Sequence, residues 1–139
     1  MTSTVEVDSE SNTVVALKRS DSVKRSNFVR LREGVWLDDE LINFVSKQVL
    51  EPVMDRGHAY SSFFFSRLLR EGEMNPQYDF SGVQRWHTRI EAGIFNLREL
   101  FVPINKDNSH WLLLRVDFEA SEITLWDSLG SNSCNQAYL

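Results

Sequence analysis

The sequence predicts one α+β domain in which helices are followed by a mainly antiparallel sheet. The length of 139 residues suffices for one hydrophobic core but not for two. Apolar residues recur at every fourth position just after Trp36, which is typical of an amphipathic helix. From Glu99 onward the pattern changes to short β-rich runs separated by polar turns. Helices first and strands later indicate the α+β class.

Charge and hydropathy exclude two classes of partner. Fifteen Lys and Arg residues against twenty Asp and Glu give a net charge of −5, which argues against binding to nucleic acid. No apolar run approaches the roughly 18 residues that span a bilayer. The first residues, MTSTVEVDSESN, are polar and acidic, unlike a secretion signal. We therefore expect no nucleic acid and no membrane among the partners.

The cysteine count bears on redox compartment and metal chemistry. Cys134 is the single cysteine, so an internal disulfide and a Cys-based metal site are both excluded. A chain with one thiol fits a reducing compartment, nuclear or cytosolic. We expect no metal and no cofactor.

The N-terminal segment is predicted to be a flexible tail over residues 1–22, with the domain beginning near Val23. Residues 1–27 contain six Ser and three Thr, no aromatic residue and no amphipathic period. Two basic pairs, at 18–19 and 24–25, fit either a nuclear import signal or a solvated linker. Both interpretations stay open at this point.

The first predicted helix begins after Trp36. Three acidic residues, 38–40, lie where the helix dipole favours negative charge. Pro52 disfavours helical backbone at Glu51, so the helix is expected to end there. The recurring apolar residues are Leu37, Leu41, Val45 and Val49.

Shorter elements are predicted between this helix and the strands. Residues 60–65 form an aromatic strand or the start of a helix, and residues 68–69 continue a short helix that ends near Gly72. Residues 71–82 have the Gly, Pro, Asn and Asp content of a loop. Residues 83–90 fit one or two further helical turns.

Three β-rich runs follow, and the apolar residues of the last two define a register. Pairing Val116 with Ile123 brings the apolar faces of these two strands together. The same pairing sets Leu112 opposite Asp127 and joins the strands through a tight turn. The runs are residues 99–105, 110–118 and 122–128.

This register predicts that a histidine meets an aspartate. His110 lies on the same face as Leu112 and diagonal to Asp127, a separation that two side chains can close. A carboxylate on one imidazole nitrogen fixes the tautomer and prepares the other nitrogen to deprotonate a nucleophile. The alternative is that Asp127 caps a turn and His110 is an ordinary loop residue. The register also sets Asp117 opposite Glu122, a like-charge pair that is tolerable only if both are solvated.

Five ordered sequence blocks carry a resemblance to a known family. The chain from Val23 to Leu139 resembles the ubiquitin-like protease family of cysteine peptidases, which process SUMO and related modifiers. The resemblance implies the N-terminal two thirds of the family's catalytic domain, a partial domain over residues 23–139. The blocks are VWLDDELINF (35–44), SSFFFSRL (61–68), VQRW (83–86), FVPINKDNSHW (101–111) and ITLWDSLG (123–130).

The resemblance implies a papain-like fold and a Cys-His-Asp triad. His110 corresponds to the general base and Asp127 to its orienting partner. Trp36 and Trp111 resemble the pair that encloses the modifier's Gly-Gly tail, since two flat rings form a slot that only a residue without Cβ can pass. Asp39 resembles a contact to the modifier's basic surface. The family commonly has Asn at position 38, so the capping chemistry there is left open.

The family's nucleophile lies in a Gln and Asp-Cys-Gly segment that has no counterpart among these residues. Cys134 falls outside that motif and is interpreted as incidental, and Gln136 does not match the family's oxyanion Gln. We therefore expect a fragment that lacks the nucleophile and is inactive by itself, with part of the apolar surface of the sheet and first helix uncovered. When complete, it would be a monomeric protease acting on SUMO or a related modifier, in the nucleus or the cytoplasm.

Two alternatives remain beside this interpretation. One is a catalytically inactive module that binds the modifier through Trp36, Trp111 and Asp39. The other is a hydrolase or acyltransferase that shares the His–Asp hairpin but does not act on a modifier.

Overall fold

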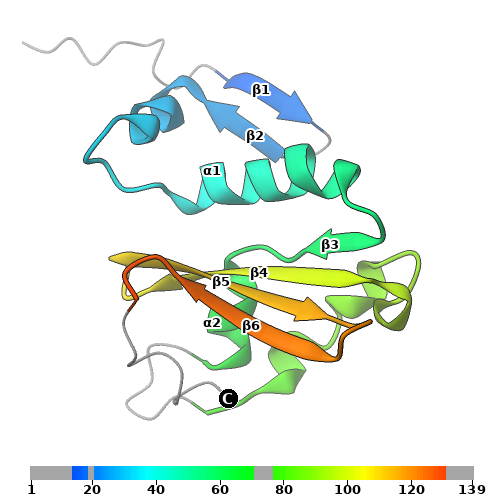
Figure 1. Cartoon of the computed structure of the whole chain (residues 1–139). Coiled ribbons are helices and arrows are strands. Elements are labelled where there is room, and N and C mark those ends of the chain that lie inside the picture. Colours follow the sequence, from blue (N-terminus) through cyan, green and yellow to red (C-terminus); the bar gives the residue numbers. More distant parts are fainter. Residues whose placement is uncertain (1–13, 19–20, 71–76, 131–139) are drawn as a thin grey trace, which may run out of the picture.

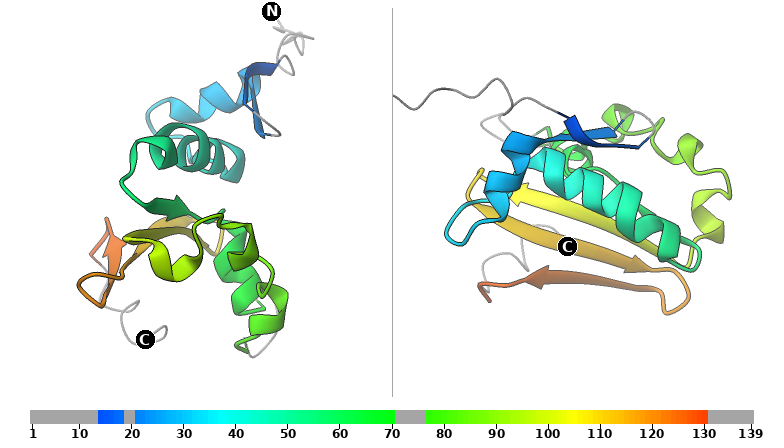
Figure 2. Two further views of the ribbon diagram at one scale, coloured as in Figure 1. Left: turned by 90° about the vertical axis from the view of Figure 1, so that its right-hand side faces the viewer. Right: turned by 90° about the horizontal axis from the view of Figure 1, so that it is seen from above.

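The structure is a computed structural model that describes residues 14–18, 21–70 and 77–130. A layer of helices lies over one face of a four-stranded sheet, and helix α2 lies over the other face (Figures 1 and 2). A two-stranded hairpin lies on the far side of the helical layer from the sheet (Figure 1). Within the described ranges no helix is long and apolar enough to cross a membrane.

The N-terminal hairpin differs from the expected tail. Strands β1 (Val14–Lys18) and β2 (Asp21–Lys24) pair in antiparallel fashion within a segment for which the sequence predicted a flexible tail to residue 22. β2 packs along α1, and its Val23 is only 1% exposed. The Ser- and Thr-rich composition concealed a short run of β-forming residues that gains stability from this packing. The domain boundary near Val23 stays a prediction.

The helical layer begins with a 3₁₀ segment, η2 (Arg25–Leu31), and continues through α1 (Asp39–Phe44) directly into the π-helix η3 (Val45–Leu50). The 3₁₀ turn η4 (Glu51–Val53) then ends the layer, with Pro52 near its start, where a proline is tolerated. The predicted helix is therefore confirmed, but the expectation for Glu51 is wrong, because its backbone keeps helical angles (φ −52°, ψ −42°) and continues into the 3₁₀ turn.

The predicted apolar face of this helix is only partly correct. Leu41 is buried, but Val49 is 52% exposed and Gln48 is buried in its place. The π-helix explains the difference, because its wider turn shifts the positions that share one face away from the four-residue spacing.

Short elements connect the helical layer to the sheet. Strand β3 (Gly57–Ala59) is followed by α2 (Phe63–Leu68), so the aromatic run expected at 60–65 begins just after a strand and ends in the first turn of a helix. Part of the predicted loop, residues 71–76, lies outside the described residues. Three 3₁₀ turns follow: η5 (Phe80–Gly82), η6 (His87–Arg89) and η7 (Ile94–Asn96).

The sheet has the order β3-β4-β5-β6 and is mainly antiparallel. β3 pairs with β4 (Glu99–Lys106) in parallel, whereas β4–β5 and β5–β6 are antiparallel. β5 spans His110–Asp117 and β6 spans Glu122–Asp127. The predicted register is confirmed, since Val116 pairs with Ile123 and Leu112 with Asp127.

The like-charge pair at the turn is also present, and the structure shows how it is tolerated. Asp117 lies opposite Glu122, but its Oδ2 accepts a hydrogen bond of 2.7 Å from Arg115 Nη2. Its Oδ1 accepts the backbone N–H groups of Ala120 and Glu119. The hydrogen bond from Ala120, together with Arg115, lowers the pKa of the Asp117 carboxyl.

The two faces of the sheet bury different amounts of apolar surface. One face carries the hydrophobic core, in which Leu100, Val102 and Ile104 of β4 pack with residues of β5 and with Tyr60 and Phe65. The other face looks toward the helical layer. An apolar groove of about 630 Å³ lies between that layer and the sheet. The expectation that part of the apolar surface on the first helix and sheet lacks its cover stays a prediction.

Candidate active site

His110 and Asp127 form a close pair at neighbouring strand ends. His110 begins β5 and Asp127 ends β6, and the register brings the imidazole Nε2 to 2.6 Å from Asp127 Oδ1. Their side chains are only 13% and 8% exposed. Asp127 Oδ1 also accepts the backbone N–H of Leu129 at 2.9 Å. The predicted His–Asp contact is therefore present and Asp127 also supports a turn, whereas His110 is the first residue of a strand and not a loop residue.

The atom that Asp127 contacts determines which nitrogen can act as a base. A carboxylate accepts hydrogen bonds, so Nε2 of a neutral His110 carries the proton in this pair. Nδ1 is then the nitrogen with a lone pair. An imidazole held in this way can take a proton from a thiol or hydroxyl placed at Nδ1, and the carboxylate stabilises the imidazolium that forms.

The two tryptophans come from segments that meet beside this pair. Trp111 directly follows His110, and its indole N–H donates a hydrogen bond of 3.0 Å to the carbonyl oxygen of Leu37. Leu37 adjoins Trp36, which is 58% exposed in the segment before α1. The hydrogen bond therefore links the segment before α1 to the sheet, and the expected slot between the Trp36 and Trp111 rings stays a prediction.

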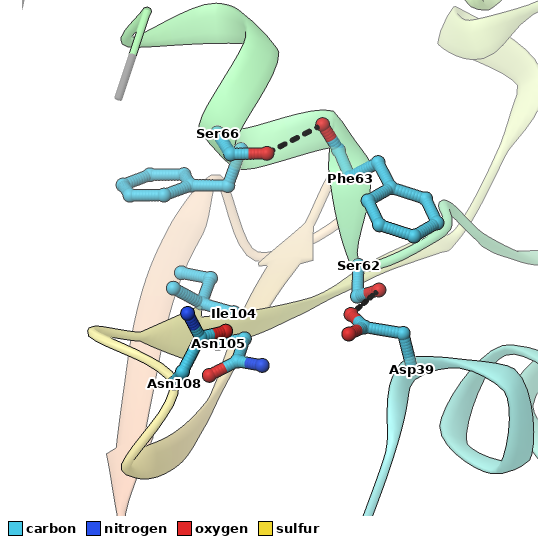
Figure 3. A pocket seen from close by; sticks show the side chains of 8 residues that line it. Asp39, Ser62, Phe63, Ser66, Ile104, Asn105 and Asn108 are labelled. Carbon is cyan, nitrogen blue, oxygen red and sulfur yellow. Dashed lines mark hydrogen bonds between the residues drawn. The ribbon is translucent and has the colours of Figure 1, made fainter. Parts of the chain in front are cut away.

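Asp39 lines a small cavity between the helical layer, α2 and β4. It is the first residue of α1, and its Oδ1 accepts a hydrogen bond of 2.5 Å from Ser62 Oγ (Figure 3). The cavity has a volume of about 180 Å³ and is also lined by Asn105 and Phe63. Asn105 Oδ1 is buried without a hydrogen-bond partner among the described residues. The cavity is therefore bordered by a carboxylate that can accept a hydrogen bond from an N–H donor.

The capping question at position 38 is answered by the geometry. Asp38 is the N-cap of α1, and its Oδ1 accepts the backbone N–H of Leu41 at 2.9 Å. Its Oδ2 accepts from the amide Nδ2 of Asn27, which also donates to Glu40 Oε2 at 2.9 Å. Asp38 therefore does what a capping Asn would do and holds the preceding segment as well. Sequence reasoning missed Asn27, because no local pattern marks a partner eleven residues away.

A charged cluster attaches the helical layer to β3 at the end of β4 away from His110. Glu51 Oε2 accepts hydrogen bonds from Lys47 Nζ at 2.9 Å and from the backbone N–H of Ala59 at 2.8 Å. His58 Nδ1 lies 3.4 Å from the same oxygen. Burial alone would raise the pKa of Glu51, but His58, the Ala59 N–H and Lys47 outweigh it and lower the pKa from 4.5 to about 2. Sequence reasoning did not identify this cluster.

Two residues weighed for catalysis lie outside the described residues. Cys134 and Gln136 both fall in 131–139, so their expected roles stay predictions. In the parts of the chain that the structure describes, no group of His, Cys, Asp and Glu side chains could hold a metal ion.

The His110–Asp127 pair has a geometry known from hydrolytic sites. A histidine held by a buried aspartate can accept a proton from a nucleophile, which is what nucleophilic hydrolysis requires of a base. Residues 35–137 match the model of the Ulp1 protease family, C-terminal catalytic domain. The chain belongs to the Ulp1 protease family, as its sequence blocks predicted.

Relatives of known sequence and structure agree with this family. The chain is 32% identical over 133 residues to ubiquitin-like-specific protease 1 of Saccharomyces cerevisiae, a match that covers 94% of this chain and 20% of that protein. Human sentrin-specific protease 3 is 33% identical over 93 residues, covering 67% of this chain and 14% of that protein.

The fold is also that of a solved Ulp1 domain. The X-ray structure of the C-terminal Ulp1 protease domain in complex with Smt3, the yeast orthologue of SUMO, superimposes with a TM-score of 0.75 at 30% identity. That match covers 88% of this chain and 53% of the solved chain. The predicted α+β, papain-like fold class is therefore confirmed, and the chain spans about half of the solved domain.

Proposed function

We propose that this chain is part of a cysteine peptidase that cleaves the peptide or isopeptide bond after the terminal Gly-Gly of SUMO or a related modifier. The observation that carries the proposal is the 2.6 Å contact between His110 Nε2 and Asp127 Oδ1, which leaves Nδ1 to receive a proton. His110 is the proposed general base and Asp127 its orienting partner. The similarity to a Ulp1 domain solved with Smt3 supports SUMO as the modifier.

The modifier's tail and its folded part are proposed to contact different residues. Trp36 and Trp111 enclose the Gly-Gly tail, since the Trp111–Leu37 hydrogen bond holds the two segments next to each other. Asp39 receives a basic group of the modifier at the cavity beside α1. The tail would thus be held next to the imidazole while the rest of the modifier lies against α1 and α2.

The nucleophile is proposed to come from chain outside the described residues, as a thiol placed at His110 Nδ1. The apolar groove between the helical layer and the sheet supports this, because an apolar surface of this size is normally covered by further structure. Cys134 is not the proposed nucleophile. The 139 residues by themselves are accordingly expected to be inactive, and the nucleus is the proposed location.

Hydrolysis of a SUMO–fluorophore conjugate tests the catalytic roles. In the protein as its gene encodes it, His110→Ala or Asp127→Asn should lower kcat by at least about a hundredfold and leave SUMO binding within about threefold. A variant that retains the wild-type rate would refute its assigned role. The 139-residue chain alone should show no hydrolysis, and activity that disappears on Cys134→Ala would overturn the proposed position of the nucleophile.

An inactive module that binds SUMO is the second candidate. It is favoured by one observation, that the hydrogen bonds holding Trp111 and Asp39 form within the described residues, which contain no cysteine. The hydrolysis assay separates the two functions. Tight binding of SUMO by a gene-encoded protein that never hydrolyses the conjugate would establish the module.

A further inference from the structure

Ser62 stands at a capping position, but its side chain does not cap the helix. It is the N-cap residue of α2, where a serine hydroxyl usually accepts a backbone N–H of the first helical turn. Here Ser62 makes no such bond. The residue is only 5% exposed, so its hydroxyl is directed to partners inside the protein. A buried hydroxyl that does not make the N-cap hydrogen bond is expected to bond to another polar group instead.

The partners of Ser62 all lie on α1. Its backbone N–H donates to Asn43 Oδ1 at 2.8 Å, and Asn43 Nδ2 donates to Ser62 Oγ at 3.1 Å. Because the hydroxyl oxygen already accepts from Asn43, its hydrogen is free to point at Asp39, where Oγ lies 2.5 Å from Oδ1. Asn43 therefore fixes the direction in which Ser62 donates.

This arrangement fixes one oxygen of Asp39 and leaves the other for a ligand. Oδ1 is held by Ser62, whereas Oδ2 makes no hydrogen bond to another of the described residues. The carboxylate borders the cavity that Asn105 also lines (Figure 3). A hydrogen bond to a charged acceptor is stronger than one between neutral groups. Holding the carboxylate before binding reduces the side-chain entropy lost when a cationic group arrives.

We propose that Ser62, oriented by Asn43, is a positioning residue that presents the Asp39 carboxylate to a cationic side chain of the modifier. This inference rests on the proposed function, because it assumes that Asp39 contacts the modifier. Ser62 itself does not touch the modifier in this proposal. Its contribution is to hold the Asp39 carboxylate in one orientation. Removing the Ser62 hydroxyl should therefore weaken modifier binding only while Asp39 keeps its charge.

A double-mutant cycle on Smt3 binding tests the inference, with Kd measured by titration calorimetry for the protein as its gene encodes it. Asp39→Asn should weaken binding about tenfold, and Ser62→Ala about three- to tenfold. Ser62→Ala added to Asp39→Asn should weaken binding no further. Salt should weaken wild-type binding more steeply than binding by either single variant, because both reduce the charge contact. If Ser62 had only a structural role, the losses from Ser62→Ala and Asp39→Asn would add, and Ser62→Ala would leave the salt dependence of binding unchanged.

Two further variants keep the test decisive. Thr88→Ala is the matched control, because Thr88 does not line the cavity and its hydroxyl donates to the backbone oxygen of Arg85, three residues earlier, at 2.7 Å. It should bind within about twofold of wild type. Asp39→Glu keeps the charge but displaces the carboxylate by one methylene, so it should weaken binding by at least about threefold without disturbing Ser62 itself.

The outcomes separate the inference from the proposed function. If Asp39→Asn binds Smt3 as tightly as wild type does, the proposed contact between Asp39 and the modifier is refuted, and the positioning role of Ser62 is refuted as well. If Asp39→Asn weakens binding but the losses from Ser62→Ala and Asp39→Asn simply add, the positioning role alone is wrong. Wild-type affinity of Asp39→Glu would overturn the positioning role even if Ser62→Ala failed to fold.

Discussion

Replacing Glu51 tests the charged cluster that attaches the helical layer to β3. In the folded protein the pKa of Glu51 is lowered from 4.5 to about 2. A carboxyl whose folded pKa is depressed contributes stability that is complete above its unfolded pKa and is lost as the pH falls through the folded value. The shift corresponds to about 3 kcal/mol, which solvent screening at a partly exposed cluster reduces to roughly 1–2 kcal/mol. Glu51→Gln removes this contribution.

Urea unfolding of wild type and Glu51→Gln at pH 7 and pH 3 measures the effect. At pH 7 the variant should be less stable by about 1–2 kcal/mol, and at pH 3 the difference should fall to roughly half or less, because the unfolded carboxyl is then largely protonated. Asp55→Asn is the control. Asp55 is 75% exposed and lies 3.6 Å from Arg98, so its replacement should change stability by less than about 0.5 kcal/mol at either pH.

Two results would refute this reasoning. Equal stability of wild type and Glu51→Gln at pH 7 would show that the cluster does not stabilise the fold. A loss that stays the same size at pH 3 would show that the variant acts through packing and not through the charge of Glu51.

Three further predictions concern stability and titration. Leu100→Ala should destabilise the protein by about 2–4 kcal/mol in chemical denaturation, because Leu100 is 6% exposed in the core, whereas Phe95→Ala at a 90% exposed position should change little. Asp38→Ala should lose about 1 kcal/mol in thermal unfolding through the missing helix cap, and Asp38→Asn should retain most of it. Arg115→Gln should raise the pKa of the Asp117 carboxyl in an NMR titration, and an unchanged pKa would contradict the contribution of Arg115.

The hairpin of β5 and β6 was predictable because its physics is local. Alternation with period two assigns each residue to a face, and burying both apolar faces together leaves one register. That register set Leu112 opposite Asp127 and brought His110 within reach of the carboxylate. What the pattern could not determine was the imidazole nitrogen that faces Asp127, since that depends on side-chain rotation.

The parts that the sequence did not predict depend on contacts between distant segments. The β1–β2 hairpin is stabilised where it packs on α1, and the sequence of residues 14–24 by itself does not predict that contact. Ser62 precedes a helix, where a serine usually caps the first turn, yet its hydroxyl donates to Asp39, 23 positions earlier. The burial of Gln48 follows from a π-helical turn that leaves no signature in the spacing of apolar residues.

The parallel pairing of β3 with β4 has a consequence for the order of folding. β4, β5 and β6 follow one another directly along the chain, so they can pair by closing short loops. Gly57 and Glu99, in contrast, are about forty residues apart when β3 joins the sheet. The meander should therefore form first, and the helical layer should dock last and detach first. Native-state hydrogen exchange should accordingly show faster exchange in β3 and α1 than in the central strand β5, where the amide protons are held from both sides.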